Sequence, residues 1–404
     1  MTHQLSPRTI ELVKATVPAL VEHGTTITRV MYERLFKDPA IRALFNQANQ
    51  GEGGGQVHAL SAAIIAYAQN IDNLSALAPA VERISHKHIG FDILPAHYPF
   101  VATALLGAIK EVLGEVASDE ILAAWGEAYW FLAGVLKARE AAMRNVIVNS
   151  EGGWSGWRKF VVAEKIRESA LITSFVLRPA DGGKVIPHRP GQYLTFRFDA
   201  ADALGLKRNY SISSGPQSDH YRISVKREVN GNGGSRHLHD FVNVGDVLET
   251  TPPSGDFFLS DDPTRPVILL SGGVGLTPMV SMVEAIAKQH PTLPTYYVHA
   301  TASSVTHAMD AHVKSLAARH ANIKVATFYS DAHETDVRGQ THDEDGLVSV
   351  DWLRANTPLL EAEIYLCGPK PFLRMFVSGL TQEGVPGERI HYEFFGPADE
   401  LLAA

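Results

Sequence analysis

A glycine-rich turn between an apolar run and a helix-like segment is the most informative chemical feature of the sequence. Residues 268–270 form the apolar run, and after Ser271 comes Gly272-Gly273-Val274-Gly275-Leu276-Thr277-Pro278. A strand, such a turn and a helix together bring backbone N–H groups and the positive end of a helix dipole against a phosphate. Gly273 and Gly275 can adopt positive φ and let a ligand approach the backbone. Because the pattern is not GxGxxG, the turn alone leaves both a nucleotide site and a plain structural turn open.

Four further motifs stand in a definite order around this turn. Pro190-Gly191-Gln192-Tyr193 and Arg208-Asn209-Tyr210-Ser211 precede it, Tyr365-Leu366-Cys367-Gly368-Pro369 follows it, and His391-Tyr392-Glu393-Phe394-Phe395-Gly396-Pro397 lies near the C-terminus. In this order the motifs resemble those of the ferredoxin–NADP reductase family, from about Gly153 onward. The resemblance implies that the RxYS strand holds FAD, and that the GGxGxTP and CGP turns hold a nicotinamide nucleotide.

Length and composition set the outer limits. A chain of 404 residues is long enough for two or three domains, and 45% hydrophobic with 20% charged residues is typical of a soluble globular protein. No apolar run reaches the length of a membrane span and no export signal is visible, so we expect a cytoplasmic protein. The single cysteine, Cys367, excludes disulfides, cysteine-based zinc sites and CxxCH haem attachment. A net charge of −8 argues against a nucleic-acid binder.

The chain divides into three segments of different pattern. Residues 1–148 are expected to be an all-α domain. Its first helix starts at Ser6-Pro7, and a break between two helices is expected at Gly24. Residues 151–157 are expected to be a linker. An antiparallel β-barrel domain is expected over 153–263 and an α/β domain with a parallel sheet over 264–404. The expected helices span 8–22, 25–37, 56–70, 77–89, 97–113 and 119–146; the expected strands span 160–166, 171–177, 193–198, 208–213 and 221–226, then 267–270, 295–299, 324–328 and 363–366.

Two histidines in the helical segment differ in the residues that precede them by one or two helical turns. Small and apolar residues precede His88 at i−3, i−4 and i−7, whereas Arg83 and Glu82 precede His86. We therefore expect His88 to face inward and His86 to face outward. An inward histidine is most often a hydrogen-bonded core residue; the alternative is a metal ligand, above all of haem iron through Nε2.

Other residues of the helical segment resemble those of a globin. On that resemblance, Phe45 packs on the haem, His88 is its proximal ligand, and Tyr32, Gln56 and Leu60 line the distal side. A globin followed by this reductase module is the organisation of the flavohaemoglobins. The resemblance therefore spans nearly all of the chain and implies haem b as a cofactor.

Some roles rest on this resemblance. Tyr98 and Glu140 are expected to hydrogen-bond the proximal imidazole, although a charge on an apolar helical stripe, like that of Glu140, can also be a surface residue. Lys87 and Glu393 match positions thought to influence redox behaviour in the family. Met31 departs from the pattern, because an aromatic residue is expected before Tyr32.

The resemblance also assigns contacts in the reductase part. Arg208 is expected to face the FAD pyrophosphate and Tyr210 the ring system. Ser235 closes a glycine-and-serine stretch that is shorter than in some relatives, and is expected to contact the flavin phosphate. The remaining expected contacts are Tyr193, Asn209, Ser211, Phe394, Phe395, Gly396 and Pro397 for FAD, and Gly273, Val274, Gly275, Leu276, Thr277, Pro278, Cys367, Gly368 and Pro369 for the nicotinamide nucleotide.

The activity implied by the resemblance is nitric oxide dioxygenase. NAD(P)H electrons would pass through FAD to haem b, whose bound O₂ oxidises NO to nitrate. The residues alone support a flavin-fed haem protein that activates a small diatomic, so an O₂ carrier and a lipid- or peroxide-reducing haem–flavin reductase stay open. The expected partners are O₂, NO and NAD(P)H, with no nucleic acid, no obligate protein partner and no membrane span. Peripheral lipid binding at the haem pocket stays open.

Overall fold

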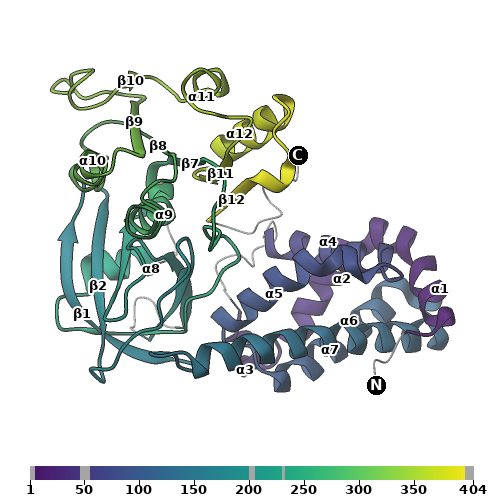
Figure 1. The fold of residues 1–404 in the computed structure, drawn as a ribbon. Helices are drawn as coiled ribbons and strands as arrows, with labels where there is room; N and C mark the ends of the chain where they lie inside the picture. Colours follow the sequence, from purple (N-terminus) through teal and green to yellow (C-terminus); the bar gives the residue numbers. More distant parts are fainter. Residues whose placement is uncertain (1–4, 46–54, 200–204, 230–232, 396–404) are drawn as a thin grey trace. The chain divides into compact units, whose positions relative to one another are not determined.

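The computed structural model describes residues 5–45, 55–199, 205–229 and 233–395. The chain forms two compact units that divide between Asn149 and Ser150 (Figure 1). The predicted site residues Gly396 and Pro397, and residues 231–232 of the glycine stretch, lie outside the described residues.

The first unit is helical. Its first helix begins as the sequence predicts, because the Ser6 hydroxyl accepts a hydrogen bond from the Thr9 N–H and Pro7 is the first helical residue. Helix α2 packs against α4 and α6, and the fully buried Trp125 donates from Nε1 to Thr16 Oγ1 at 3.2 Å. The helices are α1 (Pro7–Ala15), α2 (Val17–Leu35), α3 (Pro39–Arg42), α4 (Gly55–Gln69), α5 (Ala78–Gly90), α6 (Tyr98–Leu113) and α7 (Asp119–Asn149).

The predicted helix break at Gly24 is wrong. Helix α2 runs through this position, and the chain breaks instead at Thr16, which ends α1 and precedes α2. A Cβ on Gly24 would lie 2.6 Å from Ser61 Oγ of α4. The glycine therefore permits a close approach of two helices rather than ending one.

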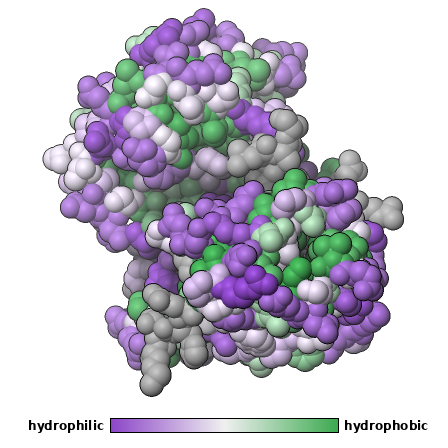
Figure 2. All heavy atoms as spheres, turned by 90° about the vertical axis from the view of Figure 1, so that its right-hand side faces the viewer, coloured by the Kyte–Doolittle hydropathy of each residue, from purple (hydrophilic) through white to green (hydrophobic). Residues whose placement is uncertain are grey.

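Apolar side chains on the surface stand among polar ones. Figure 2 shows green and purple side chains interspersed on the face that it presents. In the helical unit, Val21, Val116 and Val146 are exposed, and they lie far apart in the sequence. In the described ranges no single helix is long and apolar enough to cross a membrane. The segments Ser75–Gly90 and Pro95–Val116 together have the length and apolar composition of a span, but they are bent by 103° relative to each other.

The second unit begins with a six-stranded antiparallel sheet. Its strand order is β4-β3-β6-β1-β2-β5, and the aromatic side chains of Phe160, Phe175 and Phe196 fill its core. The sequence missed the short strand β6 and the helix α8, and β4 begins two residues before the predicted strand. The elements are β1 (Arg158–Arg167), β2 (Ile172–Pro179), β3 (Tyr193–Phe198), β4 (Leu206–Ser211), β5 (Tyr221–Lys226), α8 (Gly234–Asp240) and β6 (Val247–Thr250).

A parallel sheet in the order β10-β9-β8-β7-β11-β12 completes the second unit. Helix α9 packs against β7, β8 and β11, and α12 against β12 (Figure 1). The chain runs outward from β7 to β10 and returns to the other side of β7 with β11, so the order reverses between β7 and β11. The elements are β7 (Val267–Gly272), α9 (Leu276–Gln289), β8 (Thr295–Thr301), α10 (Asp310–Arg319), β9 (Ile323–Tyr329), β10 (Glu344–Asp345), α11 (Val350–Asn356), β11 (Glu363–Cys367), α12 (Lys370–Gln382) and β12 (Ile390–Glu393).

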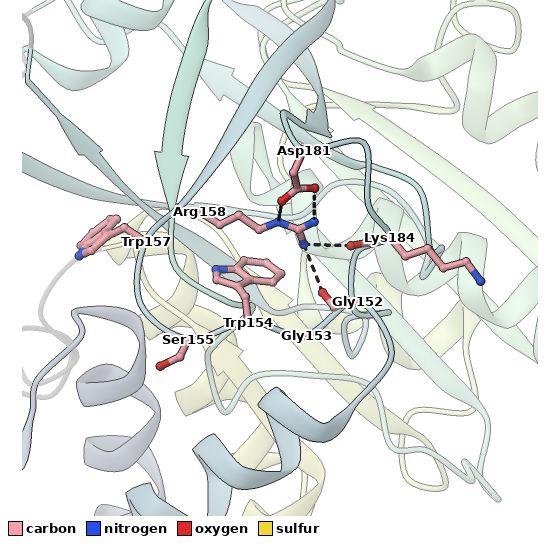
Figure 3. Close-up of a pocket in the computed structure, with 8 residues that line it drawn as sticks. All are labelled: Gly152, Gly153, Trp154, Ser155, Trp157, Arg158, Asp181 and Lys184. Atoms are coloured by element: carbon pink, nitrogen blue, oxygen red, sulfur yellow. Dashed lines mark hydrogen bonds and ion pairs between the residues drawn. The ribbon is translucent and has the colours of Figure 1, made fainter.

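The predicted linker is docked on the antiparallel sheet domain. The Arg158 guanidinium donates to the carbonyl oxygens of Gly152 at 3.3 Å and Lys184 at 2.9 Å, and pairs with Asp181 at 2.6 Å (Figure 3). A Cβ on Gly152 would lie 2.4 Å from the carbonyl carbon of Val185. A polar pocket of about 390 Å³ lies beside these residues, and none of the predicted cofactor residues lines it.

Candidate functional site

One histidine, one tyrosine and one glutamate from three helices meet in the first unit. His88 of α5 places Nδ1 2.7 Å from Glu140 Oε1 of α7 and 3.1 Å from the Tyr98 hydroxyl at the start of α6. The Tyr98 hydroxyl donates to the same Glu140 oxygen at 2.6 Å. Glu140 is 2% exposed, so the surface interpretation of this residue is wrong.

The protonation of this group follows from its surroundings. Burial, together with the hydrogen bond to Glu140, raises the pKa of Tyr98, so its hydroxyl keeps its proton and donates. The carboxylate accepts from both partners, which makes Nδ1 of His88 the protonated ring nitrogen. Within the described residues no hydrogen bond reaches Nε2. A neutral imidazole with Nδ1–H held by a carboxylate is the donor that haem iron requires, so these residues fit the expected group.

His86 does not lie where the sequence predicts. Its side chain is 13% exposed, less than the 28% of His88, and its Nε2 lies 3.8 Å from Glu82 Oε1. Arg139 of α7 donates from Nε to Glu82 at 2.7 Å. His86 is therefore mostly buried against Glu82, which α7 binds through Arg139, and the outward orientation predicted for His86 is wrong.

Aromatic rings and one amide mark the opposite side of the expected haem site. The Tyr32 ring of α2 lies 5.8 Å from that of Phe45 and 5.3 Å from that of Phe36. The Oε1 atom of Gln56 is buried with no hydrogen-bond partner among the described residues, as a polar atom that serves a ligand would be. Leu60, at i+4 from Gln56, packs on the hydrophobic core that contains Tyr32. Sequence reasoning missed Phe36, which its i+4 spacing from Tyr32 could have signalled.

The positions of other residues in the helical unit also bear on the expected haem site. Tyr129 and Leu132 of α7 pack both on the core that contains Tyr32 and on the core that contains Tyr98. Met31 is buried at 2% exposure. The structure does not bring Lys87 to the His88–Tyr98–Glu140 group, because its side chain is exposed on α5.

Five of the residues predicted to hold FAD, Tyr193 and 208–211, lie on the paired strands β3 and β4. Tyr193 pairs with Ser211 across the two strands, while Asn209 is exposed. A Cβ on Gly234, the first residue of α8, would lie 2.8 Å from Arg208 Cγ and 3.2 Å from the Tyr210 hydroxyl. The structure thus brings the start of α8 against the RxYS strand. Ser235 follows Gly234 and accepts a hydrogen bond from the Glu228 N–H at 3.2 Å.

Buried and partly buried donors make these strands suitable for a flavin nucleotide. Burial lowers the pKa of Arg208 and raises that of Tyr210, so the guanidinium carries its charge with little water around it and the phenol keeps its proton. A guanidinium, a phenol and the Ser211 hydroxyl are the donors that phosphate and flavin oxygens accept from. The donor set fits FAD.

The two turns predicted to hold the nicotinamide nucleotide, 272–278 and 367–369, meet where the parallel sheet reverses its strand order. Cys367 of β11 pairs with Ser271 of β7 on one side and Glu393 of β12 on the other. A Cβ on Gly275 would lie 2.1 Å from the Cys367 carbonyl oxygen, so only glycine permits this contact. A Cβ on Gly273, at φ +56°, would meet nothing within 4 Å among the described residues. The turn is therefore open on the side where a phosphate would approach.

Leu276, Thr277 and Pro278 of the first turn and Cys367 of the second are buried, whereas Pro369 is exposed. The Thr277 hydroxyl donates to the Val274 carbonyl oxygen at 3.1 Å and closes the first turn of α9. Burial raises the pKa of the Cys367 thiol, so it stays protonated. Phe394 and Phe395 follow β12, and Phe395 is 49% exposed. The remaining turn residues, Leu276, Pro278, Gly368 and Pro369, lie at the same edge of the sheet as Cys367 and Gly275.

Comparison with known proteins agrees with both units. The globin family model matches residues 29–136, and the oxidoreductase NAD-binding domain model matches residues 269–378. A flavohemoprotein of Xylella fastidiosa (strain 9a5c) is 60% identical over the whole of both chains. A flavohemoprotein of Bacillus thuringiensis subsp. konkukian (strain 97-27) is 46% identical over 98% of this chain and 100% of its own.

Solved structures match the fold. A flavohemoglobin of Malassezia yamatoensis, determined with bound FAD and haem, superposes with a TM-score of 0.85 at 26% identity and covers 97% of this chain and 100% of its own. The FAD- and NAD-binding domain of a nitric oxide dioxygenase from Vibrio cholerae O1 biovar El Tor is 38% identical with a TM-score of 0.53, and covers 59% of this chain and 99% of its own. The chain therefore belongs to the flavohaemoproteins, oxidoreductases that join a haem-binding globin to an FAD- and NAD(P)H-binding reductase.

Proposed function

We propose that the protein is a nitric oxide dioxygenase that uses O₂ and NAD(P)H to oxidise NO to nitrate. The observation that carries this proposal is the His88–Tyr98–Glu140 group, in which a buried carboxylate accepts from Nδ1 of the imidazole. The relative from Vibrio cholerae that bears this activity in its name matches the reductase part of the chain. We also propose the domain limits 1–148, 153–263 and 264–404 and the site roles that the sequence suggested.

The carboxylate makes the imidazole a stronger electron donor. A histidine whose Nδ1–H is held by Glu140 has more imidazolate character at Nε2 than one held by a backbone carbonyl. Strong donation to haem iron favours activation of O₂ over its simple storage. This is why we prefer an enzyme to the O₂ carrier that the sequence left open.

The opposite side of the site supplies a hydrogen-bond donor. Burial raises the pKa of Tyr32, so its hydroxyl stays protonated and can donate to a diatomic ligand. Gln56 brings a side-chain amide to the start of α4. When bound, NAD(P)H, FAD and haem supply the redox chemistry, since FAD takes up electrons in pairs and releases them singly.

Product analysis together with a proximal variant tests the proposal. In air with NO and NAD(P)H, we expect nitrate equal to the NO consumed and half as much NAD(P)H oxidised. Glu140→Gln should retain haem, lower the iron–histidine stretching frequency in resonance Raman spectra of the ferrous protein, and slow NO consumption. Reduction of a lipid hydroperoxide in place of NO consumption, or an unchanged stretch in the variant, would contradict the proposal.

A further inference from the structure

Helix α9 is fastened to the antiparallel sheet domain through a carboxylate. Glu284 accepts hydrogen bonds from the Gly215 N–H at 2.6 Å, from Arg222 Nη2 at 2.8 Å and from His312 Nε2 at 2.8 Å. Its side chain is 20% exposed, and that of Arg222 is 18% exposed. Gly215 and Arg222 belong to the antiparallel sheet domain, whereas Glu284 and His312 lie on α9 and α10 of the parallel sheet domain.

A second contact lies one helical turn before the first. The Ser281 hydroxyl donates to the Ser214 carbonyl oxygen at 2.7 Å and lies 3.0 Å from His188 Nε2. His188 is 4% exposed, and burial lowers its pKa to about 4, so it is neutral and donates from Nε2 to the serine oxygen. Ser281 and Glu284 are three residues apart and therefore face the same side of α9.

These contacts join the two halves of the expected cofactor site. Residues 213–215 continue directly from the RxYS strand that ends at Ser211, and the Arg222 guanidinium also donates to the Ser213 carbonyl oxygen. On the nucleotide side, α9 begins at Leu276, which belongs to the glycine-rich turn 272–278. Polar contacts thus tie the residues that follow the strand expected to hold FAD to helix α9, whose first turn belongs to the turn expected to hold NAD(P)H.

We propose that Glu284 and Ser281 are positioning residues that fix the nucleotide turn relative to the flavin strand for hydride transfer. The inference rests on the NAD(P)H-to-FAD half of the proposed function and is independent of the reaction with NO. A buried ion pair contributes little net stability compared with apolar residues of similar volume, but it demands one geometry. Hydride transfer is sensitive to such geometry, because misplacement of reacting groups by about 1 Å can cost on the order of 100-fold in rate.

The charge on Glu284 is maintained at neutral pH. Burial acts to raise its pKa, but the hydrogen bond from His312, the charge of Arg222 and the Gly215 N–H together hold the pKa below its ordinary value. A glutamine at this position keeps the size and loses the charge, which leaves Arg222 without its carboxylate partner in a mostly buried place.

Three variants of the full-length protein test the inference. Glu284→Gln removes the charge, Glu284→Asp keeps the charge on a shorter side chain, and Ser281→Ala removes the hydroxyl. Glu383→Gln is the matched control, because Glu383 accepts from Arg354 at 3.0 Å in the same domain, away from these contacts. Amide hydrogen exchange over residues 213–215 reports the contact itself, and anaerobic stopped-flow measurement with deuterated NADH reports flavin reduction and its isotope effect.

We expect faster exchange over residues 213–215 and flavin reduction slowed by about tenfold or more in Glu284→Gln, with smaller changes in Glu284→Asp and Ser281→Ala. The rate of haem reduction by flavin that has been reduced photochemically should not change. Faster exchange with flavin reduction at the wild-type rate would reduce the contact to a structural one and overturn the inference. If the flavin of the wild type itself is not reduced by NAD(P)H, the proposed function fails and this inference fails with it.

Discussion

At the scale of single residues, the identity of the iron ligand depends on His88 and not on its neighbour two positions earlier. The Nδ1 atom of His88 is held by Glu140 and Tyr98, whereas His86 lies against Glu82. We expect His88→Ala to lose stable haem binding or to shift the Soret band strongly, and His86→Ala to leave the spectrum as in the wild type. Absorption spectra of the two purified variants decide this, and the reverse pattern would assign the iron to His86.

Tyr32 is the residue whose hydroxyl we expect over the bound diatomic. Tyr32→Phe keeps the ring packing on Phe36 and Phe45 and removes only the donor. A neutral hydrogen bond contributes about 1 kcal/mol net, and more where water is excluded, so O₂ should dissociate about tenfold faster. Stopped-flow measurement of O₂ dissociation checks this. An unchanged rate would show that Tyr32 does not touch the ligand, and Gln56 would become the candidate donor.

The sequence predicted the residues of the site better than their surroundings. His88 could be named from the apolar residues before it, and Tyr98 and Glu140 from the family resemblance; the structure brings all three together. The low exposure of His86 could not be predicted, because His86 lies against Glu82, and Glu82 is bound by Arg139 on a helix far along the chain. Glu284 could not be found either, since its three partners are distant in sequence and only the fold gathers them.

At the scale of elements, local patterns predicted most helices and strands, and tertiary contacts explain the exceptions. Helix α2 continues through Gly24 because α4 packs closely there. Local helix propensity contains no information about such packing between helices. Strand β6 has only four residues and is held by pairing with β1 and β3. The predicted terminal motif became the edge strand β12 because Ile390–Glu393 pairs with β11.

Two buried histidines, His299 in β8 and His307 after it, make the parallel sheet domain sensitive to acid. His307 lies 3.0 Å from the Tyr329 hydroxyl and 3.6 Å from Asp310, with its ring 4.8 Å from that of His299. Burial, and then the charge of Lys314, lowers its pKa from 6.5 to about 4. Between these values the unfolded chain binds more protons than the folded chain. Stability is therefore fully present above pH 6.5 and is lost as the pH falls toward 4, by on the order of 3 kcal/mol.

His307→Gln removes this titration. Thermal unfolding of the full-length protein, followed by the fluorescence of released flavin at several values between about pH 7 and pH 5, should show a midpoint that falls more steeply in the wild type than in the variant. His290→Gln, which changes another histidine of the same domain, serves as the control. Parallel pH profiles for wild type and His307→Gln would show that His307 is accessible to protons in the folded state.

At the scale of the whole molecule, the reductase should be separable from the globin. The chain divides between Asn149 and Ser150, and Arg158 binds the linker at Gly152. A fragment that begins at Ser150 should bind FAD, reduce ferricyanide with NAD(P)H and consume no NO. A fragment that begins at Trp157 loses the Gly152 contact and should release flavin at a lower temperature. A Ser150 fragment that cannot be loaded with flavin would contradict the expectation that the reductase folds and works without the globin.

The central claim, that the protein inserts both atoms of O₂ into NO, is tested most directly by isotopic labelling of the product. Reduced protein is supplied with NAD(P)H, NO and a mixture of ¹⁶O₂ and ¹⁸O₂, and the nitrate is analysed by mass spectrometry. We predict nitrate that carries either two labelled oxygens or none, because both come from one O₂ molecule, with formation that depends on NAD(P)H and is lost in His88→Ala. Nitrate with a single label, or NO consumption that yields nitrite or nitrous oxide, would contradict the account.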